Sequence, residues 1–316
     1  MRPGNVAAAR QPRRVRLTEV AARAGVHPGT ASRALSADRR LMVGQETMQR
    51  VLRAAADLGY EPDLLARGLR TQRSFTVGVL IPGLDDLSVL PLLRGAEEAL
   101  AGAGYAALIA SIGGNREAVL ARMRTRHVDG LIIAGRLYAS APPSAWPSAL
   151  PVVVAGGPSA PPGVPAAAVD HELGARLIRD HLLRLGHRRI GRITRAEAST
   201  AREAARCTRR LVGEGCTAIA ASSDLLAAGA LTALAGTGRR CPRDVTVTGY
   251  GDTPLSTGLA PALTTVRLPY FEVGREAAAL LLTEITDVTP VAGTRQVAPE
   301  LVIRASSGPA GPSPDR

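Results

Sequence analysis

The amino-acid sequence predicts an α/β protein that carries a small, basic, three-helix domain at its N-terminus. The length of 316 residues suggests about two compact domains. After residue 73, short β-rich runs alternate with helical stretches, which is typical of parallel sheets joined by helical crossovers. Before residue 73, the apolar residues from Leu17 onward recur with helical spacing.

The positive charge is concentrated in the first quarter of the chain. The formal net charge is +12, and all 39 basic residues are arginine. Residues 1–73 hold 14 arginines and 6 acidic residues, whereas residues 74–316 hold 25 and 21. A basic domain of this kind is the electrostatic footprint of nucleic-acid binding.

Composition and motifs argue against several classes of protein. No apolar stretch approaches the ~18 residues of a membrane-spanning helix, and the basic N-terminus lacks the apolar region of a secretory signal. The three cysteines show no CxxC spacing, the five histidines are dispersed, and neither GxSxG nor HExxH occurs. We therefore expect a cytoplasmic protein with no catalytic activity, no cofactor and no metal.

The chain divides into a short series of segments. Residues 1–16 read as a flexible basic tail, 17–61 as a helical DNA-binding domain, 62–73 as a linker, 74–304 as the α/β core and 305–316 as a flexible tail rich in Ser, Pro and Gly.

The helical domain has helix-turn-helix spacing. Thr18 is the expected N-cap of a first helix ending at Ala24, and Pro28 starts a second helix that ends at Leu35. Gly25 permits the sharp turn between them, and a third helix spans 45–58. The second helix would enter the DNA major groove. An ordinary αα-hairpin is the alternative, and the basic charge argues against it.

The core elements follow in order from the periodicity and β-propensity. Strands are expected at 75–81, 105–110, 128–134, 151–155, 188–194, 217–221, 245–249 and 296–303. Helices are expected at 89–103, 115–125, 171–185, 200–212, 225–235 and 271–285.

A set of ordered motifs resembles the lactose/galactose repressor (LacI-type) family. The headpiece resemblance lies in LTEVA at 17–21, SRAL at 32–35 and LGYEP at 58–62. The core resemblance lies in VGVLIP at 77–82, VDGLII at 128–133, LGHRRI at 185–190, TAI at 217–219, SD at 223–224, CPRDVTVTGY at 241–250 and LTTV at 263–266. The resemblance implies a headpiece followed by a two-lobed core that resembles periplasmic sugar-binding proteins.

The resemblance also implies how DNA would be bound. A homodimer would bind a double-stranded, pseudo-palindromic operator, and a hinge helix over 62–73 would place Leu69 in the minor groove. A solvated linker is the alternative, because Gly68 weakens a helix. The residues expected to contact base edges are Pro28, Gly29 and Arg33. For Arg33, a phosphate contact is the alternative. The expected phosphate contacts are Thr18, His27, Thr30 and Ser32.

For the core, the resemblance implies a sugar-like effector in a cleft between the lobes. Asp224 and Asp252 are candidate ligand carboxylates, with an N-cap as the alternative role of Asp224. Asp85, Asp86 and Ser88 are further candidates in the loop after the first core strand.

The main departure from the family lies between Ile193 and Thr217, which are only 24 positions apart. A parallel crossover alone needs about a dozen residues, so one strand-helix unit, with an effector-contacting arginine, is expected to be missing. Arg202 or Arg206 could replace that arginine, but a solvated helix face is the simpler reading.

The sequence thus predicts a transcriptional regulator of the LacI type, acting as a repressor under the control of a small molecule. One alternative is a regulator that binds DNA but has lost its effector response. The other is a non-regulatory binding protein of the periplasmic type, against which the lack of an export signal counts.

Overall fold

The computed structural model describes residues 15–35, 42–60, 68, 71–83, 89–157, 163–286 and 293–311. Contacts divide the chain into two units, residues 1–72 and 73–316, which we call the headpiece and the core. The boundary lies within one residue of the predicted one. Most of the predicted linker and tails, including Leu69, lies outside the described residues.

The headpiece consists of three helices around a small core. These are α1 (Leu17–Ala24), α2 (Pro28–Leu35) and α3 (Gln45–Leu58). Gly25 ends α1 in the left-handed conformation with φ 66°, which glycine adopts without steric cost. The side chains buried at the centre are small, so the helices can approach closely: Val20, Ala21, Ala31, Ala34 and Val51.

The start of α1 differs from the prediction. The helix begins at Leu17, so Thr18 lies exposed in its first turn and is not the N-cap. The carboxylate of Glu19 accepts a hydrogen bond from the Arg16 amide at 2.8 Å, and the helix can therefore begin without a Thr cap.

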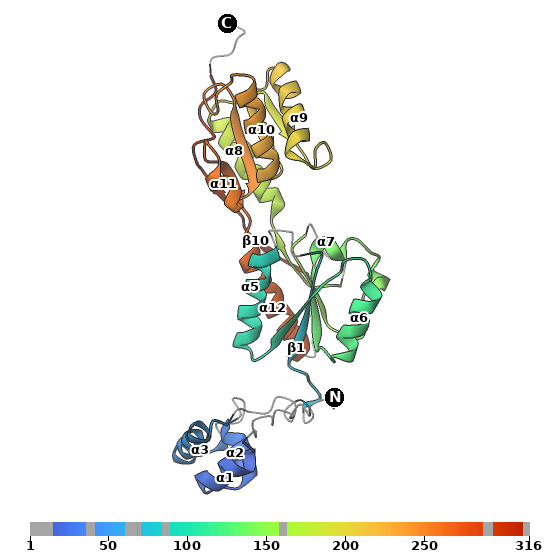
Figure 1. Cartoon of the computed structure of the whole chain (residues 1–316), viewed down its shortest axis with the longest axis vertical. Coiled ribbons are helices and arrows are strands. Elements are labelled where there is room, and N and C mark those ends of the chain that lie inside the picture. Colours follow the sequence, from blue (N-terminus) through green and yellow to red (C-terminus); the bar gives the residue numbers. More distant parts are fainter. Residues whose placement is uncertain are drawn as a thin grey trace, which may run out of the picture. The chain divides into compact units, whose positions relative to one another are not determined.

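The first lobe of the core is built on a six-stranded parallel sheet in the order β10-β5-β4-β3-β1-β2. Its strands are β1 (Thr76–Ile81), β2 (Ala106–Ser111), β3 (Gly130–Ala134), β4 (Val152–Ala155), β5 (Ala166–Val169) and β10 (Thr294–Val297). Helices α5 (Val89–Gly102) and α12 (Tyr270–Thr286) cover one side and α6 (Arg116–Thr125) the other, as Figure 1 shows. The short α7 (Gly135–Tyr138) follows β3.

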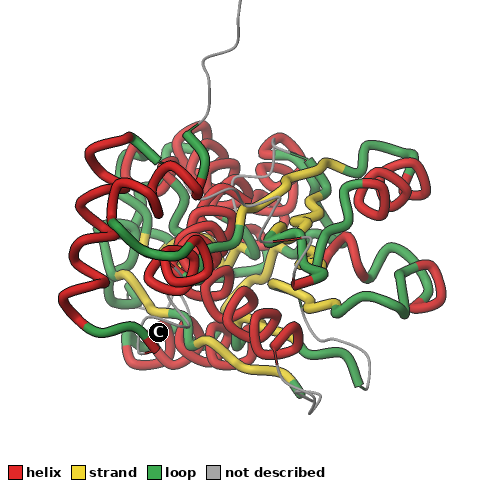
Figure 2. The backbone as a smooth tube through the Cα atoms, turned by 90° about the horizontal axis from the view of Figure 1, so that it is seen from below, coloured by secondary structure: helices red, strands yellow, loops and turns green. Residues whose placement is uncertain are grey.

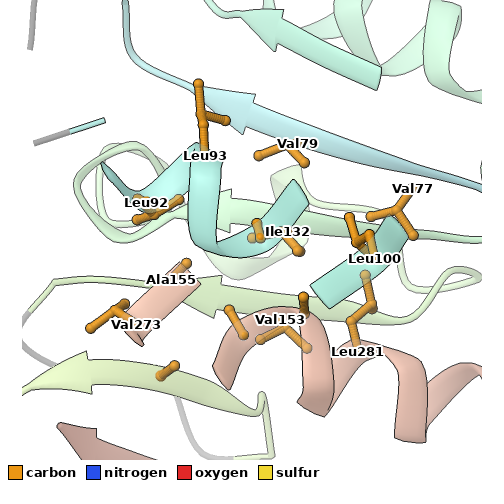
Figure 3. Close-up of a cluster of buried hydrophobic side chains, with 14 of the residues drawn as sticks. Val77, Val79, Leu92, Leu93, Leu100, Ile132, Val153, Ala155, Val273 and Leu281 are labelled. Atoms are coloured by element: carbon orange, nitrogen blue, oxygen red, sulfur yellow. The ribbon is translucent and has the colours of Figure 1, made fainter. Parts of the chain in front are cut away.

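The core of this lobe depends on close packing of α5 against α12. Aliphatic side chains from both helices and from β1, β3 and β4 meet in one cluster, shown in Figure 3. A Cβ atom on Gly95 of α5 would overlap the carbonyl oxygen of Phe271, and one on Gly274 of α12 would overlap that of Leu92. Glycine at both positions lets the two backbones touch.

The second lobe has a five-stranded sheet in the order β11-β9-β8-β7-β6. Its strands are β6 (Ile190–Ile193), β7 (Ala218–Ala221), β8 (Thr246–Gly251), β9 (Thr264–Arg267) and the antiparallel β11 (Glu300–Val302). Its helices are α8 (His171–Arg184), α9 (Ala201–Gly213), α10 (Asp224–Gly236) and α11 (Pro254–Gly258). α9 and α10 pack on one face of the sheet and α8 on the other. Seen along the long axis of Figure 1, strands lie between helices (Figure 2).

The chain crosses between the lobes after β5, after β9 and after β10. The last crossing corrects a prediction, because the run 296–303 is not one strand. Pro299 lies between β10, which joins the first sheet, and β11, which joins the second. Strands β5 and β9 were not among the predicted strands.

A single helix, α9, fills the segment between β6 and β7. In the first sheet β2 lies outside β1, whereas in the second sheet β6 is itself the edge strand and only α9 connects it to β7. This is the place where the sequence predicts a missing strand-helix unit.

The C-terminal segment packs on the second lobe as far as residue 311, so the expected flexible tail does not begin at 305. Ser306 is fully buried and its hydroxyl donates to the carbonyl oxygen of Val247 at 2.6 Å. The buried His187 donates from Nε2 to the Gly308 carbonyl oxygen at 3.0 Å and accepts from the Thr217 hydroxyl at 2.9 Å. Burial lowers the pKa of the His187 ring, which suits this neutral donor-acceptor role.

The contact between α5 and α12 leads to a stability prediction. Gly95→Ala should lower the free energy of unfolding by ~1–3 kcal/mol, because the added methyl group forces the helices apart. Gly102→Ala, in the same helix but with open space around the position, should change it by less than ~0.5 kcal/mol. Denaturant unfolding of both variants measures the difference, and equal stability would contradict the close contact.

Candidate DNA-binding surface and ligand site

Helix α2 presents the residues predicted to contact DNA on its solvent-facing side. Ala31 and Ala34 are fully buried against the other headpiece helices, which fixes the rotation of α2 about its axis. Gly29 and Arg33 are exposed as a consequence. Pro28, Thr30 and Ser32 are half-buried beside them. The structure thus brings the predicted base-reading residues together on one short helix.

Two local hydrogen bonds shape this surface. The Gly29 amide donates to Nδ1 of His27 at 3.1 Å, so the His27 ring caps the start of α2. The Arg33 guanidinium lies 3.4 Å from the Thr30 hydroxyl oxygen, one turn back along the helix. Thr18 is exposed on α1.

The candidate ligand residues of the core belong to strand ends. In parallel α/β sheets, ligands bind outside the carboxyl ends of the strands. β5 and β9 end where the chain crosses between the lobes, so the carboxyl ends of both sheets lie at the junction. Asp224 and Asp252 follow β7 and β8 at this end. Asp85, Asp86 and Ser88 lie outside the described residues.

The Asp224 carboxylate is surrounded by donors from the protein itself. Its residue is 1% exposed. The Thr253 amide donates to it at 2.6 Å, the Thr253 hydroxyl at 2.9 Å and the Thr265 hydroxyl at 2.6 Å. Asp224 is not the N-cap of α10, because Ser223 takes that role and accepts from the Leu226 amide at 3.3 Å. Asp224 therefore anchors the loop after β8 to β9.

Asp252 makes an internal ion pair. Arg304 donates to one carboxylate oxygen at 2.6 Å and Arg267 to the other at 2.8 Å, and the Ser256 hydroxyl adds a bond at 2.9 Å. Burial on its own would raise the pKa of Asp252, but the bonds from Arg304, Ser256 and Arg267 outweigh it and lower the pKa. We call these contacts, together with those of Asp224, the aspartate network.

The aspartate network changes the reading of the predicted ligand residues. The close donors of both carboxylates are protein groups, and Asp224 has almost no surface left for a ligand. Sequence reasoning did not identify the partner residues, which are Thr253, Ser256, Thr265, Arg267 and Arg304. Arg304 is 52 positions from Asp252, and no local pattern signals a pairing over that separation.

Arg202 and Arg206 are both exposed on α9. This placement agrees with the simpler reading of a solvated helix face. Among the described residues, no group of three or more His, Cys, Asp or Glu side chains is arranged to hold a metal ion. No helix in that part of the chain has the length and apolar character needed to cross a membrane.

Comparisons with known proteins agree with this architecture. Residues 16–63 match the family description "Bacterial regulatory proteins, lacI family". Residues 74–210 match "Periplasmic binding proteins and sugar binding domain of LacI family", and 193–307 match a periplasmic binding protein-like domain. The HTH-type transcriptional regulator MalR of Streptomyces coelicolor is 30% identical, and the match covers 93% of this chain and 97% of MalR. The chain belongs to the lacI family of bacterial regulatory proteins. It is a transcriptional regulator of that family.

Further comparisons concern the length of this chain and its fold. The HTH-type transcriptional repressor CytR of Escherichia coli is 28% identical, with 92% of this chain and 96% of CytR covered. That match runs over 333 aligned positions, more than the 316 residues of this chain, so CytR has residues with no counterpart here. The transcriptional regulator CelR in its cellobiose complex has a TM-score of 0.64 and 27% identity, with 93% of this chain and all of CelR covered. A lac repressor dimer bound to operator has a TM-score of 0.70 at 22% identity, which shows a shared fold.

Proposed function

We propose that this regulator is a cytoplasmic repressor that binds a pseudo-palindromic operator as a homodimer, without catalytic activity. The observation that carries the proposal is the solvent-facing side of α2, which the burial of Ala31 and Ala34 fixes in place. Two copies of such a helix, related by a two-fold axis, read two half-sites of one duplex. The lac repressor dimer bound to its operator supports this mode for the shared fold.

The proposal assigns separate roles to the α2 side chains. Arg33 reads a guanine by a forked pair of hydrogen bonds, a contact worth ~1–3 kcal/mol of discrimination. Pro28 and Gly29 lack side-chain hydrogen-bonding groups, so they read shape or make apolar contacts. The phosphate contacts that set the register are Thr18, His27, Thr30 and Ser32. Leu69 would wedge into the minor groove.

The role of Arg33 can be tested by selecting bound duplexes from a random pool with the full-length chain. Arg33→Ala should remove the preference for one base pair in each half-site and keep the rest of the motif, since the guanidinium reads one position. Arg53→Ala is the matched control, because Arg53 is an exposed arginine of the same unit on a different helix, α3. It should leave the selected motif unchanged. A uniform loss of affinity in Arg33→Ala, with the motif intact, would assign Arg33 to phosphate.

Control of the repressor by a ligand has two candidate forms. Control by a sugar-like effector is supported by the family description and by the cellobiose complex of CelR. Such a ligand would act by binding one arrangement of the lobes more tightly than the other. A repressor without a sugar response is supported by the aspartate network, since it occupies the two carboxylates best suited to hydroxyl groups. We favour the second form.

A thermal-unfolding screen separates these two forms. The full-length chain is heated alone and with each member of a panel of monosaccharides, disaccharides and nucleosides. We expect no compound to raise the unfolding midpoint, because ligand stabilisation requires a site that binds the native state. A rise that grows with ligand concentration would establish the effector-controlled form.

A further inference from the structure

The positive charge of the core is concentrated in one part of the second lobe. Residues 184–243 contain 12 arginines and 4 acidic residues, whereas the rest of 74–316 contains 13 arginines and 17 acidic residues. The segment runs from the end of α8 through β6, α9, β7 and α10, and all of its arginines are exposed. This segment of the core is therefore basic, whereas the rest of the core is acidic.

Helix α9 arranges three of these arginines in a row. Ala204, Thr208 and Leu211 are buried against the lobe, which turns Arg202, Arg206 and Arg209 to solvent. Their spacings of four and three residues place them on one helix face, about one turn or ~5.4 Å apart along the axis. We call these three residues the arginine row.

The carboxylates on and beside α9 bond to groups other than the arginine row. The Glu203 carboxylate accepts hydrogen bonds from the Ser199 amide and hydroxyl and from the Thr200 amide. These bonds lower the pKa of Glu203 to about 2, and the bond from the Ser199 amide has the largest effect. Glu197 caps Thr194 and lies 3.9 Å from Arg210, which also pairs with Glu214 at 3.2 Å. Across the described part of the chain, no carboxylate forms an ion pair with a member of the arginine row.

The surroundings extend the basic surface. α9 and α10 lie side by side (Figure 1), with a groove of about 230 Å³ between them. Arg209, Arg239, Thr208 and Thr237 line it together with Val212, Gly213, Ala233 and Leu234. On the other side of α9, β6 is the edge of its sheet. Of the large hydrophobic side chains exposed on the described surface, none belongs to α9 and one, Leu225, lies at the start of α10. A protein partner would need such anchors, whereas nucleic-acid interfaces are polar and strongly positive.

We propose that the arginine row, with Arg239 beside it, binds the phosphate backbone of duplex DNA as a second contact, independent of sequence and separate from the headpiece. Guanidinium groups bind phosphate oxygens in pairs of parallel hydrogen bonds, a geometry that suits arginine better than lysine. The contact gives the regulator affinity for DNA outside its operator, or for a second duplex segment.

The salt dependence of binding tests the proposal. Fluorescence anisotropy measures binding of the full-length chain to a duplex that lacks the selected motif, between about 50 and 200 mM salt. The triple variant Arg202→Gln, Arg206→Gln, Arg209→Gln should reduce the slope of log K against log salt by roughly 2–3, since each phosphate contact contributes about 0.9. The matched control is Arg122→Gln, Arg124→Gln, Arg126→Gln, which removes three exposed arginines from the α6 region of the first lobe. Its slope should change by less than about one contact.

Three outcomes overturn the proposal. One is an unchanged slope in the α9 variant, and another is an equal change in both variants, which would reflect net charge alone. The third is competition by polyglutamate as strong as that by duplex DNA at equal charge, which would assign the surface to an acidic protein. The triple variant Arg202→Lys, Arg206→Lys, Arg209→Lys should keep the slope, which separates lost charge from lost folding. Base reading by α2 does not enter this measurement, so its failure would leave the result intact.

Discussion

The core depends on two carboxylates that are removed from water in the second lobe. A desolvated carboxylate is costly unless donors compensate it, and here those donors come from parts of the chain that are far apart in sequence. Thr253 follows β8, Thr265 and Arg267 belong to β9, and Arg304 follows β11. Satisfying Asp224 and Asp252 therefore ties the ends of β7, β8 and β9 to the C-terminal segment, which is held to the same lobe by His187 and Ser306.

Because the aspartate network lies in the core, it bears on ligand binding by the core and not on DNA recognition by the headpiece. The aspartate network leaves the junction between the lobes with fewer acidic groups for a sugar than the sequence suggests. In the described part of the headpiece, the buried Ala31 and Ala34 turn Gly29 and Arg33 outward on α2. At the far edge of the second sheet, the short connection between β6 and β7 leaves α9 as a basic outer surface. DNA binding is thus the activity best supported for the headpiece, and the arginine row is the proposed second contact on the core.

The sequence predicted those features that depend on local patterns. Periodicity placed α9 and α12 to within one residue at each end, and Gly25 marked the turn before α2. Features that depend on distant contacts were missed. The run 296–303 looks like one strand, yet its halves pair with β5 and β9 in different sheets. The Ser- and Gly-rich segment from 305 looks flexible, yet hydrogen bonds to His187 and Val247 hold it. From the sequence Asp224 looks like a helix cap or a ligand group. Its actual partners, Thr253 and Thr265, lie 29 and 41 positions away, where no local pattern points to them.

The most direct test of this account is a double-mutant cycle on Asp252 and Arg304, measured as the free energy of unfolding of the full-length chain. Arg304→Ala leaves the Asp252 carboxylate with the bonds from Arg267 and Ser256 alone, and Asp252→Ala leaves the partly buried Arg304 guanidinium without its carboxylate. The two single losses should therefore together exceed the loss in the double variant. The account predicts a coupling free energy of ~1–3 kcal/mol. Additive effects of the two substitutions would contradict it, since they would mean that the ion pair does not hold the strand ends of the second lobe together.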